Sequence, residues 1–182
     1  MKGKMLLAVA MVVLAVGLVA APASWANSLT FQGVTFGLTD LGGTLQFTIT
    51  NALNGGSGDW TNITQLANFS FKNVGSVSNL NLGGWSTSGL ELNANGCAGG
   101  GSGGFCFTRT PALALTDSHT FNITYSGSLD LSAPHLKVRF LNAAGEKQGS
   151  LLSQTVPVAE PTSLLLLGAG LAGLGFWRRN KL

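Results

Sequence analysis

Residues 44–50 read TLQFTIT, and their alternation decides the fold of the chain. Leu45, Phe47 and Ile49 are apolar, and every residue beside them is a threonine or a glutamine. In an extended chain successive side chains point to opposite faces, so the three apolar residues share one face. Threonine, isoleucine and phenylalanine are also favoured in strands. The stretch therefore predicts a half-buried β-strand with one face in a core and the other toward water.

The same period of two recurs along the chain. ANFSFK (67–72), HTFNITY (119–125) and HLKVRF (135–140) each alternate apolar with polar residues. LTFQGVTFGL (29–38) also alternates, but its apolar residues change from odd to even positions at Gly33, which predicts a bulge or tight bend there. Segments rich in glycine, asparagine and serine lie between these stretches and predict turns. We therefore predict an all-β fold, a β-sandwich body of residues 27–156.

The N-terminal segment has the features of a secretory signal peptide. Two lysines precede an apolar run over residues 5–21, and Ser24 and Ala26 supply the small residues of a cleavage site. We predict a signal peptide of residues 1–26, exported by the Sec translocon and cut after Ala26 by signal peptidase.

Two cysteines, Cys97 and Cys106, flank a glycine-rich stretch. Close, even pairs in exported chains favour a disulfide, and two free buried thiols are the alternative. Residues 79–104 have few apolar anchors, so we expect a long loop that the disulfide closes. Two cysteines without a nearby histidine lack the ligand count for zinc, and we predict no metal site.

The overall charge reflects the ends of the chain more than its body. The isoelectric point is near 9.1, yet residues 27–158 hold five basic and six acidic side chains. The basic excess lies in the signal peptide and in the last residues, so it is no argument for a nucleic-acid partner.

The chain ends in AEPTSLLLLGAGLAGLGFWRRNKL, residues 159–182. Residues 164–177 are apolar or small and predict a short transmembrane helix of about 21 Å, which is marginal for a bilayer. Arg178, Arg179 and Lys181 follow at once, and by the positive-inside rule they hold the C-terminus in the cytoplasm. Residues 157–182 therefore form a tail whose topology agrees with an exported body.

In order and spacing, this tail resembles the PEP-CTERM sorting signal of Gram-negative bacteria. The family has a Pro-Glu-Pro-like motif, a short apolar helix and a terminal arginine cluster. Here Ala159 stands where the first proline is usual, and Glu160 and Pro161 follow. The resemblance implies a transient stay in the inner membrane, cleavage near Glu160 by the protease exosortase, and association with exopolysaccharide or biofilm. Similar tails are also labelled as the C-terminus of ice-binding proteins, but the threonines here follow no fixed repeat, so we do not predict ice binding.

Two matches to enzyme motifs lack the structural context that those motifs need. GAGLAG (168–173) fits the dinucleotide fingerprint but lies in the apolar tail, without the preceding strand or the later acidic residue. GGSGG (100–104) fits the nucleophile elbow, which needs a strand-to-helix turn. We therefore predict no catalytic residue, no cofactor and no enzymatic activity.

We predict an exported surface or matrix protein, and two alternatives remain. One is a permanently anchored single-pass envelope protein whose tail is never cut. The other is a carbohydrate-binding module, in which Trp60 and Trp85 would stack on sugar rings unless these indoles cap the core instead.

A second candidate glycan contact is the polar face of residues 135–140. His135, Lys137 and Arg139 alternate and would form a basic stripe facing an anionic exopolysaccharide, with His135 charged below about pH 6.5. The alternative is an edge strand whose charges prevent aggregation.

Overall fold

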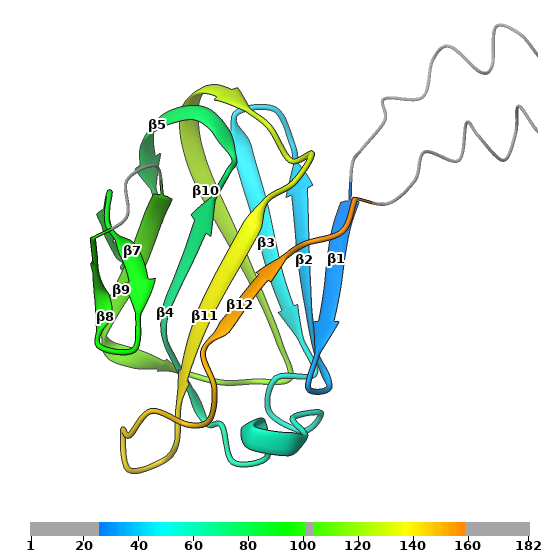
Figure 1. Ribbon diagram of the computed structural model, residues 1–182, viewed down its shortest axis with the longest axis vertical. Helices are drawn as coiled ribbons and strands as arrows, with labels where there is room; N and C mark the ends of the chain where they lie inside the picture. Colours follow the sequence, from blue (N-terminus) through cyan, green and yellow to red (C-terminus); the bar gives the residue numbers. More distant parts are fainter. Residues whose placement is uncertain (1–25, 101–103, 159–182) are drawn as a thin grey trace, which may run out of the picture.

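Two antiparallel sheets packed face to face make up the computed structural model, which describes residues 26–100 and 104–158 (Figure 1). The first sheet has the order β1 (Ala26–Phe31), β2 (Val34–Asp40), β3 (Thr44–Thr50), β10 (Ser118–Leu129) and β5 (Gly75–Asn81). The second has the order β12 (Leu152–Thr155), β11 (His135–Leu141), β4 (Gln65–Lys72), β9 (Gly104–Ala114) and β6 (Ser86–Ser88). A hairpin of β7 (Glu91–Asn93) and β8 (Gly96–Gly99) forms a separate two-stranded sheet. The predicted all-β sandwich is confirmed.

The core between the sheets is dominated by aromatic side chains. Phe47 of the first sheet contacts Phe69 and Phe71 of the second, with ring centroids 4.9 and 5.2 Å apart. Trp60 lies in the short 3-10 helix η1 (Gly58–Trp60) and packs edge-on against Phe140 at 5.0 Å. All five side chains are at most 1% exposed. Their burial supplies the main stabilisation of the sandwich.

A two-residue turn between β1 and β2 accounts for the change of phase at Gly33. Gln32 and Gly33 both have positive φ, 45° and 80°, and Phe31 pairs with Val34 across the turn. Such a turn matches the right-handed twist of the strands that it joins. The predicted tight bend is therefore present, and the odd and even apolar residues belong to two different strands.

The outer face of the first sheet carries hydroxyl and amide side chains in rows across the strands. Thr35 pairs with Thr50, and Thr48 pairs with Thr120. Gly37 and Gln46 interrupt these rows. The face is therefore polar and uncharged along β3, but it is no uniform threonine lattice.

The predicted loop at residues 79–104 is wrong. That segment contains the end of β5, the strands β6, β7 and β8, and the start of β9. Its few apolar residues suffice because β5 and β6 are edge strands and the hairpin β7–β8 lies outside the second sheet, where one buried side chain can hold it. Leu92 of β7 is that side chain, at 1% exposure.

Both ends of the sandwich are attached to the turn between β10 and β11. Asn27, which is 1% exposed, donates a hydrogen bond from its side-chain amide to the backbone oxygen of Leu131. The backbone N–H of Val156 donates to the oxygen of Pro134 at 2.8 Å. Figure 1 shows the start of β1 beside the end of β12. The chain therefore enters and leaves the sandwich at the same place.

The two predicted targeting segments fall largely outside the described residues. Residues 1–25 of the predicted signal peptide and the predicted helix at 164–177 are not among them. Within residues 26–100 and 104–158, no helix has the length and apolar character needed to cross a bilayer.

Replacing Asn27 with alanine should destabilise the protein by about 1 kcal/mol, because the buried oxygen of Leu131 loses its donor. Chemical denaturation of the full chain measures the effect. Ser28→Ala is the matched control, since Ser28 is the exposed neighbour on the same strand. Equal stability of the two variants would mean that the hydrogen bond from Asn27 to Leu131 contributes nothing to the free energy of unfolding.

Candidate functional site on the outer face of the second sheet

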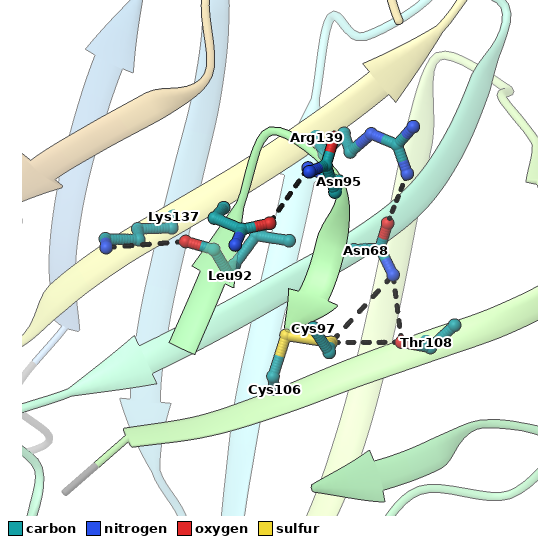
Figure 2. Close-up of a disulfide and its surroundings, with 9 residues drawn as sticks. Asn68, Leu92, Asn95, Cys97, Cys106, Thr108, Lys137 and Arg139 are labelled. Atoms are coloured by element: carbon teal, nitrogen blue, oxygen red, sulfur yellow. Dashed lines mark hydrogen bonds between the residues drawn. A yellow bond between two sulfur atoms is a disulfide. The ribbon is translucent and has the colours of Figure 1, made fainter. Parts of the chain in front are cut away.

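The hairpin β7–β8 covers part of the outer face of the second sheet (Figure 2). Glu91 on β7 pairs with Lys72 of β4 and with Lys137 of β11, whose ammonium group lies 3.1 Å from Glu91 Oε2. Lys137 also donates to the backbone oxygen of Leu92 at 3.4 Å. One carboxylate therefore holds two cations, and the hairpin is attached to two strands of the sheet.

These contacts correct both interpretations of the basic stripe. Lys137 is only 19% exposed and shares the carboxylate of Glu91 with Lys72, so it is no free surface charge for a polysaccharide. Arg139 is half-buried and points toward Asn68. The stripe does not lie on an edge strand either, because β11 is flanked by β12 and β4. The sequence pattern found the shared face correctly but could not show that a hairpin lies on it.

His135 lies at the far end of the same stripe and is half-buried. Its Nε2 lies 2.9 Å from the hydroxyl of Ser153 on β12. Burial lowers the pKa of His135, and the nearby charge of Lys137 lowers it further. The histidine therefore gains its charge at a lower pH than the sequence-based expectation assumed.

A disulfide joins the hairpin to β9. Cys97 and Cys106 are bonded with their Cα atoms 5.6 Å apart, which confirms the predicted bridge. The hydroxyl of Thr108 donates to Cys97 Sγ at 3.0 Å, and the amide of Asn68 donates to Thr108 Oγ1 at 2.9 Å. Asn68 is 2% exposed, so this polar chain lies beneath the hairpin.

Arg139 is positioned by the same polar chain (Figure 2). Its Nη1 donates to the side-chain oxygen of Asn68 at 3.1 Å, while its Nε is buried and has no hydrogen-bond partner. Arg139 and Arg109 both line a cleft of about 480 Å³ between the hairpin turn and the strands β4, β9 and β11. Neither arginine forms a salt bridge with any residue in 26–100 or 104–158. The cleft therefore combines two guanidinium groups without a counter-charge.

Irregular strand pairing opens this cleft. On one side of β4, Leu66 pairs with Leu113 and Asn68 with Thr108, so residues 109–112 of β9 leave the ladder opposite Ala67. On the other side, the register of β11 with β4 shifts between Arg139 and Phe140. Bulges re-aim side chains and interrupt pairing, often next to functional sites. Asn68 and Thr108 meet as direct partners of strands far apart in the sequence, and Arg109 lies in the irregular part of β9, so the three residues had no sequence signal as a group.

The two tryptophans lie elsewhere. Trp60 has no exposed surface, and its indole N–H donates to the backbone oxygen of Ser150 at 3.0 Å, so it cannot stack on a sugar. Trp85 is half-buried and packs against Phe69 and Phe121. The proposed sugar contact at Trp60 is wrong because the core needs its indole.

Other predicted site residues fall outside this region. Ala26 is the first residue of β1. The sorting residues Ala159, Glu160, Pro161, Arg178, Arg179 and Lys181 lie outside the described residues. Within the described part of the chain, no group of three histidine, cysteine, aspartate or glutamate side chains is placed to hold a metal ion.

The pH dependence of stability should report the ion pairs of Glu91. Hydrogen bonds from Lys72, and then from Lys137, hold the pKa of Glu91 below its usual range. A lowered pKa stabilises the fold above the unfolded value, about 4.3, and this contribution disappears as the pH falls through the folded value. Glu91→Gln should therefore be less stable than the wild type at neutral pH, and the difference should shrink in acid.

Denaturation curves at several pH values test this expectation. Glu146→Gln serves as the control, because Glu146 is exposed and is in no salt bridge among the described residues. A difference between wild type and Glu91→Gln that stays constant down to acid pH would contradict it.

Removing the disulfide with the double change Cys97→Ala and Cys106→Ala should cost about 2–3 kcal/mol of stability. The effect arises mainly because the bond, with a sequence separation of 9 residues, restricts the unfolded chain. Denaturation with and without reductant measures it, with thiol labelling of the exported wild-type chain as the companion test. Stoichiometric labelling of both cysteines in the unreduced native protein would contradict the bridge.

Comparison with known proteins adds the identity of the tail and little about the body. No curated protein gives a significant match to the chain. Among solved structures, a protein from Nocardia farcinica described as having an immunoglobulin-like fold matches with 9% identity and a TM-score of 0.36, over 75% of this chain and 95% of that one. A score that low supports no argument about fold or function. Residues 157–179 match the model of the PEP-CTERM protein-sorting motif. The chain therefore carries a PEP-CTERM protein-sorting motif directly after an all-β sandwich domain.

Proposed function

We propose that the chain is an exported, non-enzymatic surface or matrix protein whose tail is cut by exosortase. The single observation that carries this proposal is the sorting motif at residues 157–179, because such a motif implies exosortase processing and export in Gram-negative bacteria. The sandwich is then the part that is delivered to the cell surface or to an exopolysaccharide or biofilm matrix.

The position of the motif relative to the sandwich supports cleavage. Val156 is 1% exposed and its backbone N–H donates to Pro134, whereas Pro157 is exposed and Val158 is half-buried. Only residues 157–159 separate Val156 from Glu160. A protease needs backbone that is free of such contacts. A cut near Glu160 therefore removes the tail and leaves every described strand intact.

A binding role for the body, rather than a catalytic one, agrees with its charges. The ionisable side chains that the hairpin brings together, Lys72, Glu91 and Lys137, form ion pairs with one another. The cleft at Arg109 and Arg139 favours the second candidate, a carbohydrate-binding module, because its two cations have no partner among the described residues. The two roles are compatible, since a matrix protein must bind something in the matrix.

Intact-mass measurement of the exported protein tests the proposal. In cells with exosortase we expect a chain that begins at Asn27 and ends near Glu160. In cells that lack exosortase, the chain should extend to Leu182 and stay in the inner membrane. Replacing Arg178, Arg179 and Lys181 with glutamine should weaken retention of the tail, because the positive-inside signal is lost.

A reporter fused after Leu182 is the topological control and should be active only in the cytoplasm. A chain that extends to Leu182 in cells with exosortase would contradict the proposal and identify a permanently anchored envelope protein instead.

A further inference from the structure

A cleft lies between the hairpin turn and the second sheet. It is lined by Asn95, Gly96 and Ala98 of the hairpin, by Arg109 of β9 and by Arg139 of β11, among others. Its volume of about 480 Å³ is in the range of small-molecule sites. Nothing within residues 26–100 and 104–158 supplies an acidic group to it.

Arg139 presents a free donor group to an anion. The guanidinium group uses Nη1 for Asn68 and makes no other hydrogen bond to the described residues. Its Nε is buried and closed to a ligand, whereas Nη2 is not among the buried unpaired atoms of the described residues. A carboxylate in the cleft can accept a charge-assisted hydrogen bond from Nη2.

The neighbours of Arg139 suit the rest of a sugar ring. Asn95, Thr108 and Thr110 line the same cleft with amide and hydroxyl groups that can both donate and accept hydrogen bonds. Arg109 adds a second positive charge from the opposite wall, β9. We propose that this cleft binds the carboxylate of an acidic sugar, a uronic acid residue in an extracellular polysaccharide. The choice of a saccharide rests on the proposed function, which brings the body into contact with exopolysaccharide.

The disulfide has a part in this site. It fixes the hairpin turn above β9. Cys97 Sγ accepts a hydrogen bond from the hydroxyl of Thr108, and that hydroxyl accepts one from the side-chain amide of Asn68. Asn68 then orients Arg139. The guanidinium group is thus preorganised before a ligand arrives, and preorganisation lowers the cost of binding.

Calorimetric titration of the full chain in neutral detergent tests the proposal. The probes are trigalacturonic acid and its methyl ester, which has the same rings without the charge. We expect the acid to bind at least about tenfold more tightly than the ester, as a charge-assisted hydrogen bond in a cleft with two cations predicts. The affinity for the acid should fall as the salt concentration rises.

Three variants locate the site. Arg139→Lys keeps the charge but loses the rigid group that donates to Asn68 through Nη1 and leaves Nη2 free. Arg109→Gln removes the second cation, and each change should weaken acid binding by about tenfold. Lys147→Gln is the matched control, since Lys147 is an exposed cation that does not line the cleft. Circular dichroism melts verify that all variants fold, and Arg109→Gln keeps the test valid if Arg139→Lys does not.

Each contrary result has a definite meaning. Equal binding of acid and ester would overturn the carboxylate site, as would an equal loss in Lys147→Gln, which indicates only diffuse charge attraction. Tighter binding of an acetylated alanine tripeptide than of trigalacturonic acid would overturn the saccharide as the ligand. The mass measurement on the tail is independent of these titrations, so failure of either proposal is recognised separately.

Discussion

The packing of Phe69 is the contact on which both layers of the domain depend. This side chain has no exposed surface, and its ring contacts Phe47 and Phe121 of the first sheet as well as Phe71 and Phe107 of the second and Trp85 before β6. Because β4 lies at the centre of the second sheet, Phe69 fixes that sheet against the first. A smaller side chain there would leave a cavity that both sheets line.

The outer face of β4 is also buried, and the polar side chains on this face organise the candidate site. Asn68 and Ser70 alternate with the phenylalanines of β4 and are 2% and 4% exposed beneath the hairpin. A buried amide must find hydrogen-bond partners. Asn68 finds them in Thr108, Cys97 and Arg139, which come from three different elements. The hydrogen bonds of one buried amide thus connect an arginine, a hydroxyl group and a disulfide.

The sequence predicted the fold well where local alternation and burial agree. TLQFTIT is β3 without adjustment, and the phase change at Gly33 marks a real turn. The hairpin was missed because its attachment comes from Leu92, Glu91 and the disulfide, and not from an alternating pattern of its own. The candidate site was predicted only in part. The sequence predicted Arg139 as a candidate glycan contact, and this stays a prediction, but Arg109 lines the same cleft through a register irregularity that no local pattern encodes.

The shared anchorage of the two chain ends has a mechanical consequence. β12 is held to β11 by four paired positions, of which Thr155, opposite His135, is closest to the exit of the chain. A force that draws residue 158 away from the sheet would act first on the contact between Val156 and Pro134 and then on Thr155. The pairs would break one after another, as in unzipping, and not together, as in shear. Under tension the domain would therefore yield at its exit strand while β4 and the aromatic core still hold.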